Sequence, residues 1–439
     1  MPCPHPYPCP ALLTLCRCVG ACLAAAAIWC GAVAHGAVPS DPVPEAPAAV
    51  PLAALPPPYR PPYVPTSDSD VLQQVPADSD PAVRDMTLLR HALERDPTSL
   101  PAADRLARAY IDFGRQLGDA HYAGYAEAVL APWLAKAPTP PLALVDEATI
   151  LQYRHQFSEA RAQLKQALAQ GASNAQAWLT LATIDMVQGD YSSAVHDCSQ
   201  VAASGGPVLG IACTGNLRSY LGQAQQSLVI LTQIAGDAPS LTLPFKAWVQ
   251  GLLAETAERL GDWTQAEDHY RKALALTPKD NYLLVAYADL LLDRHRPEEV
   301  LTLLRDSGQS DTAFLRLALA KDALHSPDLP QYVWIMGARF EALAQRGSDY
   351  FGREQVRFAL HLQHDPRLAL DLAERNWQIQ RAPWDARVFL EAALAANQPQ
   401  AASAVLAFIR DTKLQDPVIA SLARQLQTPV TAPTASERR

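Results

Sequence analysis

Residues 247–278 read AWVQGLLAETAERLGDWTQAEDHYRKALALTP, and their pattern is the clearest indication of the fold. Apolar residues recur every three or four positions on both sides of Gly261, which predicts two amphipathic helices. A tight break between helices commonly needs a positive φ, which glycine adopts freely. Asp262 follows as a plausible N-cap, and Trp263 begins the second helix. The stretch is therefore expected to form two helices joined by a short turn.

The same two-helix unit repeats from about residue 141 onward. Gly189 and Gly222 occupy turns equivalent to Gly261, and the shared register places residues that tolerate positive φ at the other turns. Successive turns are 34, 33, 39, 34, 69 and 33 residues apart, where 69 is two periods with one degenerate unit inside. A period near 34 predicts stacked helix pairs. The remaining turn residues are His155, His295, His364 and Asn397.

Small residues mark the points where the two helices of a unit approach closely. Ala254 of the first helix is followed twelve positions later by Ala266, and other units keep this spacing. Tyr270 and Ala273 then complete an i, i+4, i+7 stripe that faces the neighbouring unit. Larger residues interrupt the pattern in later units, where we expect altered packing angles. These residues are Val300, Arg357 and Leu390.

This series resembles the tetratricopeptide repeat. The residues that carry the resemblance are Leu253, Ala254, Gly261, Trp263, Ala266, Tyr270, Ala273 and Pro278. It implies an all-α, right-handed superhelical α-solenoid of about nine helix pairs over residues 81–427. The expected units lie near 101–138, 141–174, 175–207, 208–246, 247–280, 281–310, 311–349, 350–382 and 383–414, with a first capping helix at 81–95 and a last one at 416–427.

The beginning of the chain is typical of an exported protein. Arg17 precedes an apolar run that ends in small residues suited to signal peptidase, so residues 1–36 are predicted to be a signal peptide. The alternative is an uncleaved anchor over residues 19–38, which is just long enough to span a membrane. We therefore expect a periplasmic protein, or one anchored to the inner membrane. The order of leader, linker and repeats also resembles exported proteobacterial tetratricopeptide proteins, a resemblance that implies no particular activity.

Composition separates the ends of the chain from the repeats. Thirteen of the 37 prolines lie between Pro39 and Pro81, which predicts a disordered, partly polyproline linker at residues 37–80. Residues 428–439 are predicted to be a disordered tail. The formal net charge is −9 without a basic stripe, so we expect no binding to nucleic acid, and membrane contact only through a retained leader.

Two cysteines remain outside the leader. Cys198 lies on the second helix of one unit, and Cys213 lies on the first helix of the next unit, on the side expected to face it. An oxidising compartment would allow them to form a disulfide between adjacent units. The alternative is a pair of separate buried thiols.

The chain carries no recognisable catalytic motif. It has no phosphate-binding loop, dinucleotide-binding glycine turn, nucleophile elbow or zinc-protease helix, so we expect no enzymatic activity and no cofactor. His361 and His364 lie one helical turn apart, but the sequence indicates no third or fourth metal ligand. We therefore expect no metal site.

The resemblance implies a partner peptide or helix bound in the concave groove, which the first helices line. The chain is thus expected to be a protein–protein interaction scaffold or assembly adaptor of the cell envelope, with a self-associating structural solenoid as the alternative. The middle of the groove is acidic and would favour a neutral or basic segment, unless it is an ordinary solvated face. The candidate residues are Tyr153, Thr183, Asn216, Tyr220, Trp248, Glu255, Arg259, Asp289 and Asp293.

Overall fold

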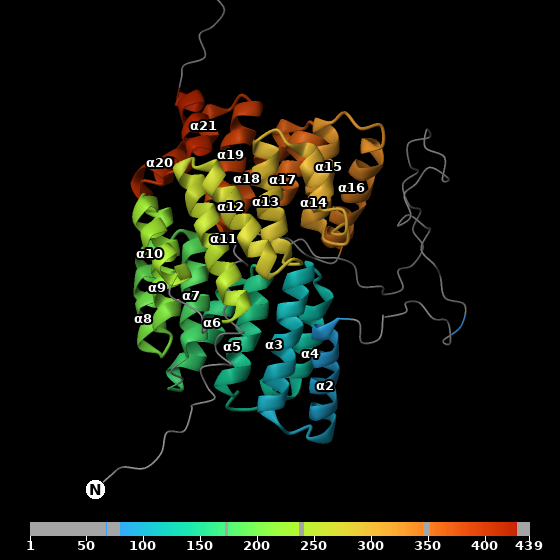
Figure 1. Ribbon diagram of the computed structural model, residues 1–439, viewed down its shortest axis with the longest axis vertical. Helices are drawn as coiled ribbons and strands as arrows, with labels where there is room; N and C mark the ends of the chain where they lie inside the picture. Colours follow the sequence, from blue (N-terminus) through green and yellow to red (C-terminus); the bar gives the residue numbers. More distant parts are fainter. Residues whose placement is uncertain (1–66, 68–79, 172–173, 237–240, 346–351, 428–439) are drawn as a thin grey trace, which may run out of the picture.

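The computed structural model describes residue 67 and residues 80–171, 174–236, 241–345 and 352–427, and the regular secondary structure of these ranges is helical (Figure 1). The predicted leader and tail lie outside the described residues, as does the linker apart from its residues 67 and 80. No helix within the described ranges is both long enough and apolar enough to cross a membrane.

Consecutive helices pack against one another as pairs, which confirms the all-α solenoid fold. The first helix of the described residues is α2 (Pro81–Arg95). The regular pairs are α3 (Leu100–Leu117) with α4 (His121–Leu134), α5 (Pro141–Tyr153) with α6 (Phe157–Ala169), α7 (Ala175–Gln188) with α8 (Tyr191–Ala203), α9 (Pro207–Tyr220) with α10 (Ala224–Gly236), α11 (Leu243–Leu260) with α12 (Trp263–Leu276), α13 (Asn281–Asp293) with α14 (Pro297–Leu303), and α15 (Asp311–Ala323) with α16 (Leu329–Gln345).

The C-terminal units are less regular. The short α17 (Arg353–Arg357) continues into the π-helical turn η3 (Phe358–Leu362) and packs against α18 (Pro366–Ile379). The π-helical turn starts directly after Arg357, one of the large residues that replace a small one. The last elements are α19 (Pro383–Ala395), the 3-10 turn η4 (Pro399–Ala402), α20 (Ser403–Thr412) and α21 (Pro417–Gln427).

The turns have the backbone conformation that the repeat requires. Every turn residue predicted from the register has a positive φ, from 53° at Asn397 to 78° at Gly189. His325, with φ of 50°, supplies the turn of the degenerate unit and divides the 69-residue interval into 30 and 39. Asp190 and Asp262 cap the following helices, accepting hydrogen bonds from the backbone N–H groups of Ser193 and Gln265.

The solenoid curls until units far apart in sequence meet along two seams. At the N-terminal seam, α3 contacts α13, and Arg115 Nη1 donates to Asp280 Oδ2 at 2.9 Å (Figure 1). At the C-terminal seam, the turns that follow α7 and α9 meet the last units. There the backbone N–H of Arg381 donates to the carbonyl oxygen of Val187 at 2.6 Å. The two seams close the concave side of the solenoid.

Candidate functional site: a cavity at the centre of the solenoid

The first helices of the central units converge on one interior cavity of about 80 Å³. Its walls come from α3, α9, α11 and α13 on one side, and from α17, α19 and the start of α21 on the other. These two sides are distant in sequence and meet only because the solenoid closes. Six of the nine predicted groove residues line this cavity: Asn216, Tyr220, Trp248, Glu255, Arg259 and Asp289.

The other three predicted residues do not line the cavity. Tyr153 and Thr183 are buried, and the Thr183 hydroxyl donates to the carbonyl oxygen of Leu179 at 2.9 Å. Asp293 lies at a smaller neighbouring hollow, where Arg387 forms a bidentate ion pair with it at 2.6 and 2.7 Å. These positions are therefore occupied by contacts within the chain.

The structure corrects the expectation of an open acidic groove, because the carboxylates have internal partners. Arg387 neutralises Asp293, and Arg259 lies 3.2 Å from Glu255, which also accepts a hydrogen bond from the Tyr282 hydroxyl. Asp289 is paired with two arginines. Consequently the acidic residues of the concave side are not free to attract a basic segment while the solenoid is closed.

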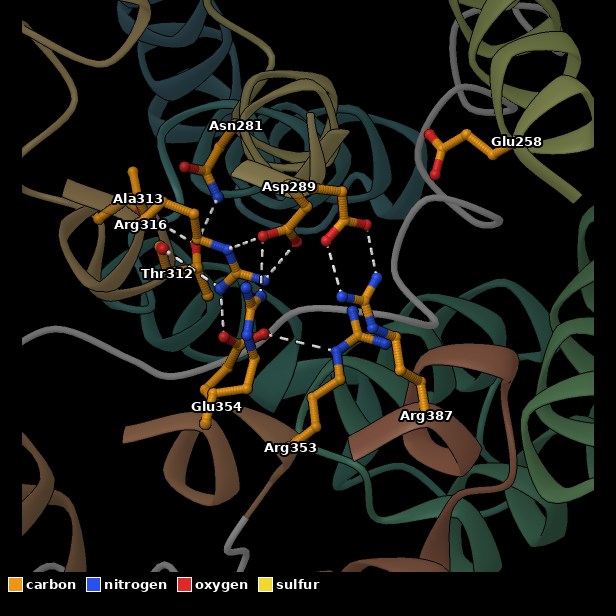
Figure 2. Close-up of polar contacts among 12 residues, drawn as sticks. Glu258, Asn281, Asp289, Thr312, Ala313, Arg316, Arg353, Glu354 and Arg387 are labelled. Atoms are coloured by element: carbon orange, nitrogen blue, oxygen red, sulfur yellow. Dashed lines mark hydrogen bonds and ion pairs between the residues drawn. The ribbon is translucent and has the colours of Figure 1, made fainter. Parts of the chain in front are cut away.

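Asp289 belongs to a buried ionic network that joins α13, α15 and α17 (Figure 2). Arg316, only 1% exposed, donates from Nε and Nη2 to the two oxygens of Asp289 at 3.0 and 2.7 Å, and its Nη1 donates to Glu354. Arg357 Nη1 donates to Asp289 at 2.8 Å. Removing one member would leave buried charges unpaired, which typically costs about 3–5 kcal/mol.

Electrostatics within this interior follow from burial and pairing. Burial opposes ionisation of Asp289, but the guanidinium groups of Arg316 and Arg357 outweigh it and hold the pKa of this carboxyl at about 2. Glu258 stands apart from the network in Figure 2, and burial raises the pKa of its carboxyl well above the usual value. The Tyr270 hydroxyl donates to Glu258 at 2.6 Å.

The two cysteines form a disulfide in the structure. Cys198 on α8 and Cys213 on α9 have Cα atoms 5.5 Å apart, and both side chains are buried. The bond joins adjacent units, as the register predicts.

The two histidines considered as metal ligands have other surroundings. His361 Nε2 lies 3.7 Å from Glu391 Oε2, and His364 is the exposed left-handed residue of its turn. Across the described residues, no group of three or more His, Cys, Asp or Glu side chains is arranged to hold a metal ion.

The residues of the opposite wall are not among those that the repeat pattern predicts. Arg353 and Trp384 come from C-terminal units, and Asp416 precedes α21. Arg357 gave a hint from the sequence, because it is a large residue at a position where the repeat has a small one. The contacts that close the solenoid bring these residues to the cavity, and the repeat period of about 34 residues does not predict such contacts.

Comparison with known proteins agrees with the repeat pattern. Residues 247–290, which include most of α11, all of α12 and most of α13, match the family model of the tetratricopeptide repeat. The chain is also similar to the APC/C hetero-tetramer Cut9-Hcn1 in its crystal structure, with a TM-score of 0.39 and 12% identity, covering 79% of this chain and 53% of that one. The match therefore spans about half the length of that chain.

A second similar structure is the TPR domain of P58(IPK), with a TM-score of 0.21 and 13% identity, where 79% of this chain and 92% of that chain are covered. No curated protein matches the chain significantly. Residues 247–290 thus match the tetratricopeptide repeat, and the described helices on either side of this segment are also arranged as packed pairs.

Proposed function

We propose that this chain is a non-catalytic protein–protein interaction scaffold of the bacterial cell envelope, which binds a partner segment through the concave side of its solenoid. The observation that carries the proposal is the convergence of six predicted groove residues on one central cavity. Protein binding is the general role of tetratricopeptide arrays, and the disulfide between Cys198 and Cys213 supports an oxidising compartment.

Because the solenoid is closed, a partner segment can reach the concave side only after a change of conformation. A cavity of about 80 Å³ holds several water molecules, whereas a helix with its side chains is about 10–12 Å across. Binding of a helix or an extended peptide along the concave side therefore requires one of the two seams to open. The partner would have to bind the open form more tightly than the closed form, and its contacts would replace those lost at the seam.

Site-specific photo-crosslinking in the native cells tests this proposal. The photoreactive residue p-benzoylphenylalanine replaces Tyr220, which lines the cavity, or Val229, which is 52% exposed on α10. We expect a discrete crosslinked partner at position 220, in the envelope fraction, and none at position 229. Equal products at both positions, or products only in the cytoplasm, would contradict the proposal.

The alternative of a self-associating structural solenoid gives a different outcome in the same experiment. Crosslinked bands would then contain only this chain, and light scattering would show a mass that rises with protein concentration.

A further inference from the structure

The central cavity has hydrogen-bond donors without partners. Arg259 is 7% exposed, and only its Nη2 has a partner, Glu255 Oε2 at 3.2 Å. Among the described residues, no group accepts a hydrogen bond from its Nε or Nη1, nor from the indole N–H of Trp248, which is 6% exposed. A buried donor without a partner is costly, and in native structures it commonly marks an unseen water or ion.

A second arginine faces the same cavity from the opposite wall. Arg353 on α17 is 5% exposed, and the hydrogen bond that the structure gives it runs from Nε to Glu354 Oε1 at 3.4 Å (Figure 2). That carboxylate is shared, because Arg316 also donates to it. Two buried guanidinium groups, from residues 94 positions apart in the chain, thus line the same cavity, and Arg259 has unused donors there.

The acidic residues on the cavity wall are already engaged. The carboxylate of Asp280 is paired with Arg115, and that of Asp289 with Arg316 and Arg357. Asp416 caps α21 by accepting the backbone N–H groups of Val418 and Ile419, both at 2.9 Å, and burial raises its pKa. The unpaired donors of Arg259 and Trp248 therefore favour a ligand that accepts hydrogen bonds, and the two guanidinium groups favour one that carries negative charge.

The size and the walls of the cavity restrict that ligand further. A volume of about 80 Å³ suits a molecule of a few heavy atoms. The rings of Tyr220, Trp248 and Trp384 provide apolar wall, and the Arg259 guanidinium stacks on the Tyr220 ring with 4.6 Å to its centroid. An anion with a short hydrocarbon part uses both kinds of surface. Arginine forks also match the two oxygens of a carboxylate.

We propose that the central cavity is a binding site for a small aliphatic carboxylate, held between the guanidinium groups of Arg259 and Arg353 with the Trp248 indole N–H as a third donor. This site goes beyond the proposed scaffold function and does not depend on it. Because both walls are needed, a bound carboxylate bridges units that only the closed solenoid brings together, and it stabilises that closed form.

Calorimetric titration of the purified full chain with acetate and succinate tests the site, with inorganic phosphate and chloride as the comparison anions. We expect saturable binding of at least one carboxylate and a rise in melting temperature at saturation. Arg259→Met should weaken binding by at least about tenfold, and Trp248→Phe, which keeps the ring but loses the N–H, by about three- to tenfold. The control Arg296→Met removes a partly exposed arginine on another surface and should bind as the wild type does.

Two outcomes would overturn the proposal. One is the absence of binding by wild-type protein up to about 10 mM carboxylate, which leaves water as the occupant. The other is binding that Arg259→Met and Trp248→Phe leave unchanged while both proteins keep the wild-type circular dichroism spectrum. Equal affinity for phosphate would overturn the ligand class, because the apolar walls would then contribute nothing.

Discussion

The turn residues of the repeat adopt a left-handed backbone that most side chains avoid. Histidine serves at four of these turns, and among them His155 is buried while His364 is exposed. Asn397 shows that asparagine supports the same conformation in this chain. The local backbone therefore requires tolerance of positive φ and not an imidazole, so a histidine can be replaced there without losing the turn.

His155 should make the protein sensitive to acid. Burial, together with the nearby positive charge of Arg353, lowers the pKa of His155 to about 3. The folded pKa thus lies below the unfolded value of about 6.5, so the unfolded state binds the proton first and stability falls as pH drops from about 6.5 towards 3. The contribution of neutral His155 to the free energy of unfolding is fully present above about pH 6.5. Below that pH it falls by up to about 1.4 kcal/mol per pH unit.

The variant His155→Asn should flatten this dependence. Guanidinium unfolding between pH 7 and pH 4 measures it, and His364→Asn, at an exposed turn, is the control that should retain the wild-type slope. Parallel pH profiles for all three proteins would show that His155 does not titrate in this way.

Among the elements, α8 and α9 are joined covalently as well as by packing. The Cys198–Cys213 disulfide lies within the core cluster that extends from α7 to α11. Its 5.5 Å Cα separation is the common one for disulfides. The register predicts that both cysteines lie on facing helices, and the structure decides between the two alternatives in favour of the disulfide.

Loss of the disulfide should destabilise the solenoid by about 3 kcal/mol, because the crosslink closes a loop of about 15 residues and limits the unfolded chain. The measurement is denaturant unfolding of the Cys198→Ala/Cys213→Ala protein and of the wild type with and without reductant. The reductant comparison separates the crosslink from the lost sulfur packing. Two free thiols by intact mass after alkylation, with an unfolding midpoint that reductant does not move, would refute the prediction.

For the whole molecule, the important feature is closure along two seams. Gly222 has φ of 69°, and a Cβ there would overlap with the carbonyl oxygen of Lys413 across the C-terminal seam. Gly171 has φ of 80°, and a Cβ there would meet nothing within 4 Å. A side chain at Gly171 would therefore cause backbone strain alone, whereas one at Gly222 would also disturb the contact that closes the solenoid.

Alanine at these two positions should have different consequences. Gly171→Ala should cost about 1–2 kcal/mol through backbone strain alone. Gly222→Ala should cost more, and it should increase the radius of gyration in small-angle X-ray scattering because Lys413 must move away. An unchanged radius together with equal losses of unfolding free energy would mean that the seam is not closed in solution.

The amino-acid sequence was enough to predict the helix pairs, the left-handed turns, the aspartate caps and the facing cysteines. Each of these depends on residues close together in the chain or on a register that repeats every 34 residues or so, and local physical chemistry is enough to specify them. Six of the cavity residues could also be predicted, since they occupy one face of successive first helices.

The packing of distant units was needed to show that this face is closed, that Asp289 and Asp293 are paired within the chain, and that Arg353 lines the same cavity as Arg259. Those contacts join residues such as Arg115 and Asp280, which are 165 positions apart. The small rotation between each unit and the next accumulates over the whole array, and that sum determines where distant units meet. A repeat pattern specifies neighbours, whereas closure depends on every unit between them.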